Sequence, residues 1–307
     1  MPDVPPDEKW ATLPDGVELC YETFGVPGAR PLLLVMGLGG PMTWWPRDLC
    51  TRLADAGFFV IRYDNRDTGR STAFKHLRVP RQHLVRAFLG RRVPVPYSLR
   101  DMATDGVHLL DHLGLERAHV AGISMGGMIA QTMAIDHPDR VLSLTSISST
   151  TGNRRVGWLD PRLMPYMLRR AARGQAEYVK GSIDFWRRIA SPAFPGSEDE
   201  ARERAELTWE RGLNLSGVMR QTIAIITQRD RTEALHHVRV PTSVVHGLSD
   251  RMVHVSGGKA TARAVPGAAL TLVPGMGHDI PVEVYDTLVG AVSRAADRAD
   301  KRADVRR

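Results

Sequence analysis

A serine stands at the centre of the segment Gly122-Ile123-Ser124-Met125-Gly126, and a further glycine follows it. The apolar run Ala118–Ile123 predicts a short buried strand, and residues 125–137 predict a helix. Between a strand and a helix, the G-x-S-x-G pattern places its serine on a sharp turn that exposes the hydroxyl. This pattern predicts that Ser124 is a nucleophile; an incidental serine at a glycine-rich helix start is the alternative.

A serine hydroxyl needs a histidine base that is held by a carboxylate. Two later segments, Thr242–Gly247 and residues 270–273, predict strands, and a turn of small residues follows each of them. Asp250 lies in the first turn and His278 in the second. Because catalytic groups gather at the carboxyl ends of parallel strands, we expect Asp250 to orient His278, and His278 to act as the general base for Ser124.

Other residues compete for these two roles. His246 and His254 flank Asp250, although His246 ends a predicted strand and is expected to pack or to hydrogen-bond locally. A turn-forming role is the alternative for Asp250. After the predicted strand Val141–Ile147 the first carboxylate is Asp160, so the main alternative position for the acid looks empty.

Hydrolysis through an acyl-enzyme also needs two backbone N–H groups aimed at the developing oxyanion. Met125, directly after the nucleophile, is expected to supply one of them. The turn Gly37-Leu38-Gly39-Gly40 follows the strand predicted at residues 31–36, and its flexibility would let Leu38 supply the other. A turn that is merely permissive is the alternative.

Strands and helices alternate along most of the chain, which predicts an α/β fold with a mostly parallel sheet between helices. Residues 1–149 and 241–307 form the predicted core, and residues 150–240 form a predicted helical cap because this segment contains no convincing strand. Further strands are predicted at Glu18–Phe24 and Phe58–Tyr63, and further helices at residues 99–114, 161–173, 175–189, 199–213, 216–227 and 282–298.

The composition, 43% hydrophobic and 24% charged residues, is typical of a globular protein. No apolar run is long enough to cross a membrane, and the acidic, proline-rich start lacks the features of a secretory signal, so we expect a cytoplasmic protein. Cys20 and Cys50 have no metal-ligand spacing and are expected to be reduced thiols. The predicted chemistry needs no metal or organic cofactor, and the sequence does not indicate an oligomeric state.

The formal net charge of +7 has two visible sources. One is the end of the chain, where interspersed acidic residues suggest a solvated helix end. The other is a basic cluster at residues 76–92, inside a long connection at residues 73–97 that is expected to be irregular. We expect no nucleic-acid partner, but a nucleic-acid or membrane-surface binder remains an alternative because of this cluster.

Several segments together resemble the α/β-hydrolase superfamily. The segment Tyr63-Asp64-Asn65-Arg66-Asp67-Thr68-Gly69-Arg70-Ser71 is similar to the one that follows the fourth strand in that superfamily, where its Asp and Arg are expected to hold a tight turn. Together with the Ser-Met-Gly elbow and Pro274-Gly275-Met276-Gly277-His278, it resembles actinobacterial esterases of the aclacinomycin methylesterase type. In this chain Met36 stands where the superfamily usually has a histidine, directly before the oxyanion glycine. Enzymes of the methylesterase type share this feature. The resemblance implies an eight-stranded, mostly parallel sheet with an inserted helical cap.

The predicted function is therefore serine-dependent hydrolysis of a carboxylic ester of a small, bulky and apolar substrate. Thioester, lactone or carbon–carbon bond hydrolysis and cofactor-free perhydrolysis are alternatives on the same triad, and a non-hydrolytic small-molecule binding protein is another. The polyketide ester of the methylesterase type is not carried over, because such enzymes differ most in the cap. The candidate pocket residues are Gly37, Trp44, Trp158, Met164, Tyr166, Met167 and Trp186. For each of them, packing in the core is the alternative.

Overall fold

The computed structural model describes residues 7–167 and 172–304. Eight strands form a single sheet in the order β1-β2-β4-β3-β5-β6-β7-β8. β1 pairs with β2 and β2 with β4 in antiparallel fashion, and all other neighbours are parallel. This confirms the predicted fold class. The strands are β1 Lys9–Thr12, β2 Glu18–Phe24, β3 Arg30–Val35, β4 Phe58–Tyr63, β5 Ala118–Ile123, β6 Val141–Ile147, β7 Thr242–Gly247 and β8 Ala269–Val273.

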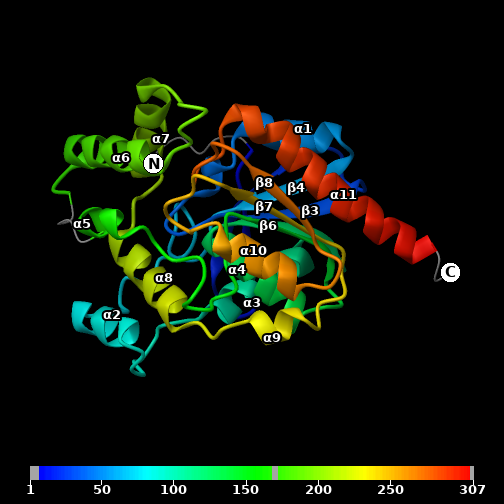
Figure 1. Ribbon diagram of the computed structural model, residues 1–307, viewed down its shortest axis with the longest axis horizontal. Coiled ribbons are helices and arrows are strands. Elements are labelled where there is room, and N and C mark those ends of the chain that lie inside the picture. Colours follow the sequence, from blue (N-terminus) through cyan, green and yellow to red (C-terminus); the bar gives the residue numbers. More distant parts are fainter. Residues whose placement is uncertain (1–6, 168–171, 305–307) are drawn as a thin grey trace.

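Helices cover both faces of the sheet, as Figure 1 shows. One buried cluster joins the sheet to α3, α4 and α10, and a second joins its other face to α1 and α11. The helix α4 is apolar on nearly all sides, and a helix of that kind must be buried on all sides. The helices of these layers are α1 Arg47–Asp55, α3 Leu99–His112, α4 Met125–Asp136, α10 Ser256–Ala264 and α11 Tyr285–Asp304, with the short turns η1 Met42–Trp44 and η3 Val282–Val284.

Residues 150–240, called the helical insertion below, connect β6 to β7 and contain no strand among the residues that the structure describes. Its helices are η2 Pro161–Leu163, α5 Met164–Met167, α6 Gln175–Ile189, α7 Glu198–Glu210, α8 Leu215–Thr227 and α9 Thr232–Leu235. The helix predicted at residues 161–173 is shorter: residues 172 and 173 are not helical, and residues 168–171 lie outside the described residues. In Figure 1, α5 to α8 lie together on the side of the sheet opposite the end of α11.

The expectation of an irregular connection at residues 73–97 is wrong in its middle, where α2 spans Arg81–Phe88. This helix packs against α8. Arg154 donates to the carbonyl oxygens of Ala87 (2.9 Å) and Phe88 (3.0 Å), and so caps the C-terminal end of α2. The contacts that hold this helix come from residues distant in sequence. The prolines and arginines around it did not predict a helix.

No helix in the described ranges is both long and apolar enough to cross a membrane. Cys20 and Cys50 are both buried and free. Burial raises the pKa of the Cys50 thiol to about 12, so it stays protonated at neutral pH. The prediction of two reduced thiols is confirmed.

Candidate active site

Ser124 occupies a strained turn between β5 and α4. Its backbone has φ 57° and ψ −121°, a conformation that residues other than glycine rarely adopt, and α4 begins at the next residue. A Cβ atom on Gly122 would lie 2.1 Å from the carbonyl oxygen of Gly126, and one on Gly126 would lie 2.0 Å from that of Val35. Glycine is therefore required at both positions, and the turn presents the serine hydroxyl at the carboxyl end of the sheet.

The structure brings Ser124, His278 and Asp250 together. The Nε2 atom of His278 lies 3.0 Å from Ser124 Oγ, and its Nδ1 atom lies 2.8 Å from Asp250 Oδ2. The other carboxylate oxygen of Asp250 accepts the backbone N–H groups of Met252 and Val253, each at 2.9 Å. The three side chains follow β5, β8 and β7, and they form one continuous series of hydrogen bonds.

Asp250 is buried yet held in its charged form. Burial alone would raise the pKa of the carboxyl group, but the charge of His278 and hydrogen bonds from His246 and His278 lower it to about 2. Because an ionised carboxylate can only accept hydrogen bonds, Nδ1 of His278 carries a proton. When the ring is neutral, its Nε2 atom carries no proton and can accept that of Ser124.

His246 and His254, the competing bases, are engaged elsewhere. Nε2 of His246 lies 2.8 Å from the carbonyl oxygen of Val253 and 3.4 Å from Asp250 Oδ2. A Cβ atom on Gly258 would lie 2.4 Å from the His246 ring, so the ring is closely packed. The ring of His254 stacks on Trp158 at 4.1 Å. The expectation that His246 hydrogen-bonds locally is confirmed.

The glycine turn after β3 lies against the nucleophile. A Cβ atom on Gly37 would lie 3.2 Å from the Cβ atom and 3.7 Å from the Oγ atom of Ser124. Asn65 donates to the carbonyl oxygen of Met36 (3.0 Å), which fixes the start of the turn. The N–H of Leu38 donates to no other group in residues 7–167 and 172–304. It is therefore available for a ligand.

Sequence reasoning missed Gln221, a fully buried residue of α8 that fixes the other end of this turn. Its Oε1 atom accepts the N–H of Gly39 at 2.8 Å. Its Nε2 atom donates to the carbonyl oxygen of Arg66 and to Thr68 Oγ1, both at 2.8 Å. The available signal was the long polar pair Arg220 and Gln221 inside a largely apolar helix.

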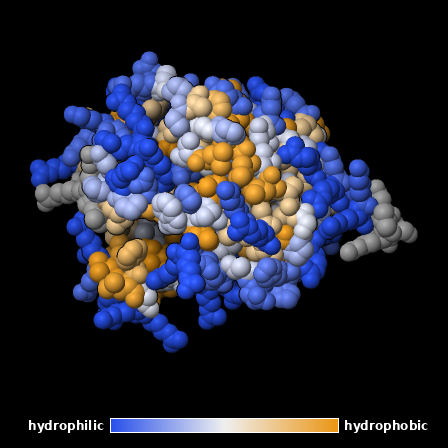
Figure 2. Space-filling model, viewed as in Figure 1, coloured by the Kyte–Doolittle hydropathy of each residue, from blue (hydrophilic) through white to orange (hydrophobic). Residues whose placement is uncertain are grey.

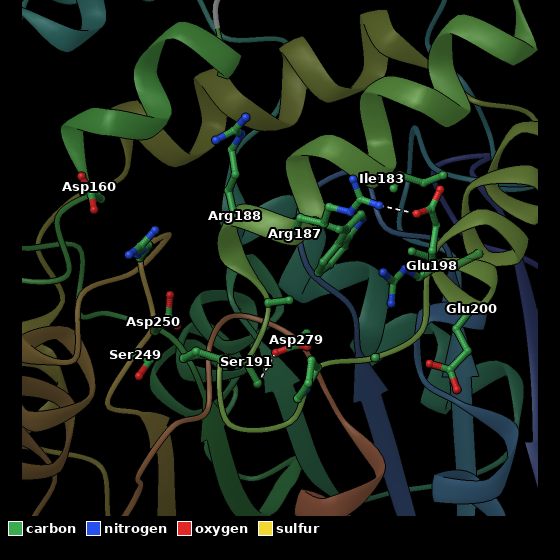
Figure 3. Close-up of a pocket in the computed structure, with 18 of the residues that line it drawn as sticks. Asp160, Ile183, Arg187, Arg188, Ser191, Glu198, Glu200, Ser249, Asp250 and Asp279 are labelled. Atoms are coloured by element: carbon green, nitrogen blue, oxygen red, sulfur yellow. Dashed lines mark hydrogen bonds and ion pairs between the residues drawn. The ribbon is translucent and has the colours of Figure 1, made fainter.

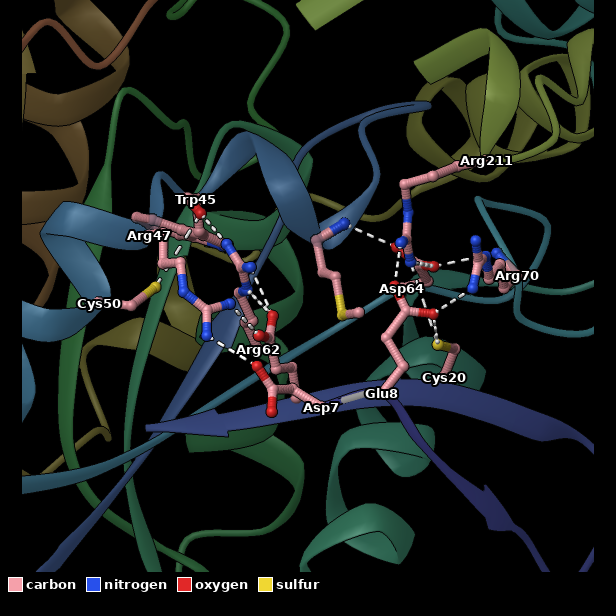
Figure 4. Close-up of polar contacts among 12 residues, drawn as sticks. Asp7, Glu8, Cys20, Trp45, Arg47, Cys50, Arg62, Asp64, Arg70 and Arg211 are labelled. Carbon is pink, nitrogen blue, oxygen red and sulfur yellow. Dashed lines mark hydrogen bonds and ion pairs between the residues drawn. The ribbon is translucent and has the colours of Figure 1, made fainter. Parts of the chain in front are cut away.

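The segment 64–71 has the structural role that was expected of it. Asp64 accepts the N–H groups of Met42 (2.6 Å) and Arg70 (2.9 Å) and forms an ion pair with Arg211 (2.6 Å) at the end of α7, as Figure 4 shows. Asp67 pairs with Arg220 of α8 through two bonds of 2.7 Å and accepts the Tyr97 hydroxyl. These buried pairs fasten the helical insertion to the rest of the protein.

A cavity of about 690 Å³ lies beside the triad, between α6, α7 and the loops after β7 and β8. Figure 3 shows that Asp250 and Asp279, the neighbour of His278, reach its wall. Aromatic side chains and many ionic ones line the cavity, including the Arg187–Glu198 pair. The lining is therefore less apolar than the sequence suggested, and Ser124 itself is not part of it.

The predicted pocket residues are dispersed. Trp158 and Trp186 line the cavity. Trp44 is outside the lining, because it packs edge-on against Trp186 and donates to Thr208. Met164 is exposed, and Tyr166 lies beneath the guanidinium of Arg188. The side chain of Met167 lies outside the described residues.

A profile of the alpha/beta hydrolase fold matches residues 30–283. The chain belongs to this family. It is similar to the rhodomycin D methylesterases DauP of Streptomyces sp. (strain C5), with 29% identity, and DnrP of Streptomyces peucetius, with 28%; each match covers 91% of this chain and 94% of the relative. A hydrolase from Pseudomonas aeruginosa PA01 has a similar structure, with a TM-score of 0.70 and 26% identity over 94% of this chain and 97% of that one. These findings confirm the resemblance inferred from the motifs.

Proposed function

We propose that this protein is a serine-dependent carboxylic ester hydrolase that works through an acyl-enzyme. The observation that carries the proposal is the series Asp250–His278–Ser124, with hydrogen bonds of 2.8 and 3.0 Å, on a strained turn that faces a glycine turn. The methylesterases among the relatives support an ester as substrate. The chemistry of the site needs only these side chains and water.

In the first half-reaction, His278 removes the proton of Ser124 as the hydroxyl attacks the ester carbonyl. The N–H groups of Leu38 and Met125 stabilise the negative oxygen, and one such donor typically contributes about 3 kcal/mol. His278 then gives its proton to the departing alcohol. Asp250 stays ionised and stabilises the charged ring.

In the second half-reaction, water attacks the acyl-enzyme, with His278 as base and the same two N–H groups as oxyanion donors. The carboxylic acid leaves, and Ser124 regains its proton. Because both half-reactions use the same groups, the loss of Ser124 or of His278 would stop the whole cycle.

The helical insertion would act as a cap over a core made of residues 1–149 and 241–307. In this arrangement the cavity beside Asp250 holds part of the substrate. Its walls combine Trp158 and Trp186 with ionic side chains. This lining favours a substrate with both ring systems and polar groups, rather than a wholly apolar one.

The test combines fluorophosphonate labelling with turnover of short p-nitrophenyl esters by the wild type, Ser124→Ala and the control Ser293→Ala. We expect Ser124→Ala to lose both labelling and turnover, and Ser293→Ala, a change on α11, to keep both. Undiminished hydrolysis by Ser124→Ala would refute the proposal. If Ser124→Ala is inactive as expected, a panel of esters, thioesters and lactones would define the bond that the wild type prefers.

A further inference from the structure

The segment around α2 carries most of the net charge of the protein. Residues 73–97 contain no aspartate or glutamate and six lysines and arginines, against a net charge of +7 for the whole chain. All six are exposed, and none of them forms an ion pair within the described part of the chain; they are Lys75, Arg78, Arg81, Arg86, Arg91 and Arg92. Elsewhere many surface arginines are paired, as Arg52 is with Asp286 and Arg100 with Asp136.

Three large apolar side chains stand among these cations. Val85, Phe88 and Leu89 are 61%, 67% and 66% exposed. Their spacing of three and four residues places Phe88, and Leu89 directly after the helix, on the same side of α2 as Val85. Figure 2 shows the hydrophobic side chains gathered at this place, with hydrophilic ones around them. Contiguous exposed apolar surface of this kind marks an interaction site on a protein.

The structure holds this surface in a defined position. Ala87, on the opposite side of α2, is buried, and α2 packs against α8. The two bonds from Arg154 fix the last carbonyl groups of the helix. Figure 1 shows α2 at the margin of the molecule, away from the sheet, so its outer side projects from the surface.

We propose that these nine residues, Lys75, Arg78, Arg81, Val85, Arg86, Phe88, Leu89, Arg91 and Arg92, form an α2 patch that docks the protein on an anionic lipid bilayer. The apolar side chains enter the boundary between headgroups and acyl chains, and the cations contact lipid phosphates. A projecting apolar helix surface suits a fluid bilayer. A nucleic acid would instead bind the cations and leave Val85 and Leu89 in water.

The test measures co-sedimentation of the full chain with phosphatidylcholine vesicles that contain either no anionic lipid or about a third of phosphatidylglycerol. We expect binding to the anionic vesicles that weakens as salt rises from about 0.01 to about 0.5 M. The charge variant Arg81→Gln/Arg86→Gln/Arg91→Gln/Arg92→Gln should reduce the partition coefficient by roughly a thousandfold at low salt. The apolar variant Val85→Ser/Phe88→Ser/Leu89→Ser should reduce it by at least about tenfold.

Matched controls remove the same chemistry elsewhere. Arg117→Gln/Arg263→Gln/Arg294→Gln/Lys301→Gln and Val26→Ser/Leu270→Ser change exposed residues away from α2 and should bind as the wild type does. Ser124→Ala should bind equally well, which separates this proposal from the proposed catalysis. All variants are first compared by thermal unfolding, so that a misfolded protein is not counted as one that has lost binding.

Three results would overturn the proposal. One is a wild-type protein that fails to bind the anionic vesicles at low salt. Another is an apolar variant that binds as tightly as the wild type, since charge alone would then suffice. The third is retention on duplex DNA under the same conditions with an affinity that the apolar variant leaves unchanged, because that result would make a nucleic acid the partner.

Discussion

The helical insertion meets the rest of the molecule along two unlike borders. Along α8 and the end of α7, buried side chains fasten it: Arg211 pairs with Asp64, Arg220 pairs with Asp67, and Gln221 bonds to the glycine turn. Along α6 and the start of α7 the border is a cavity, and its ion pairs are solvent-exposed, like that of Arg187 and Glu198. We call these the fastened border and the open border.

The difference between the borders follows from the cost of burying charge. A buried ion pair demands complete hydrogen bonding, so it permits one arrangement of the chain, whereas an exposed pair tolerates several. The fastened border lies against the turn of Leu38, where the proposed catalysis would need fixed geometry. The open border lies where substrates of different shape would enter. The four predictions below test this division, from the largest expected effect to the smallest.

Breaking the buried pair of the fastened border should have the largest effect. We expect Arg220→Met to lower the free energy of unfolding by about 3–5 kcal/mol, because Asp67 stays buried without its partner. Glu198→Gln, at the open border, removes exposed pairs with Arg187 and Arg202 and should change the free energy of unfolding by less than about 1 kcal/mol. Urea unfolding of both variants measures the contrast, and equal losses would end the distinction between the two borders.

Gln221 tests whether the fastened border also serves catalysis. Gln221→Met leaves the N–H of Gly39 and the carbonyl oxygen of Arg66 without their partners, at a cost of about 2 kcal/mol. We expect kcat to fall by roughly ten- to a hundredfold while KM changes little, because the turn would lose its fixed position in the transition state. Thr222→Val, one residue later, is the control, since its hydroxyl bonds only within α8. A purely structural role would lower stability and leave kcat unchanged.

Asp250 borders the cavity, yet its carboxylate is buried and accepts hydrogen bonds from Met252, Val253 and His278. Its pKa of about 2 is below the ordinary value of 3.8, so it stabilises the folded state above pH 4, and this contribution is lost as the pH falls towards 2. The shift corresponds to about 2 kcal/mol. We expect the free energy of unfolding of the wild type, relative to that of Asp250→Asn, to fall by this amount as the pH drops from 5 to 2. Urea unfolding at a series of pH values measures it. A difference that does not vary between pH 2 and pH 5 would contradict it.

The smallest effect on stability should come from the open border. Trp158 is 48% exposed and stacks on His254 at the cavity wall. Trp158→Ala should change the free energy of unfolding by no more than about 1 kcal/mol and raise KM for aromatic esters by roughly threefold to tenfold. KM for acetate esters should stay near that of the wild type. An equal rise for both substrates would mean that the cavity does not select the ring.

Features that short segments encode could be predicted from the sequence. β5, β6 and β7 have the predicted bounds, because each is a short segment delimited by turns. The positions of Ser124, Asp250 and His278 followed from which strand each one succeeds. Their meeting could be expected because parallel strands end at one edge of the sheet.

What remained hidden depends on partners distant in sequence. α2 forms against α8 and is capped by Arg154, so its own residues did not predict it. Gln221 acquires its role only because α8 lies over the glycine turn, 182 positions earlier in the chain. The cavity is formed by α6, α7 and several loops from separate parts of the chain, which explains why, of the predicted pocket residues whose side chains the structure describes, only Trp158 and Trp186 line it.

The central claim is that Ser124 carries an acyl group during turnover, and mass spectrometry of an intercepted intermediate tests it most directly. The protein is mixed with p-nitrophenyl acetate, quenched with acid in the first turnover and digested with a protease. We predict one acetyl group on the peptide that contains Ser124, formed together with a burst of p-nitrophenol. Steady release of p-nitrophenol with no acetylated peptide and no burst, under conditions where deacylation is slowed by low temperature, would contradict the account.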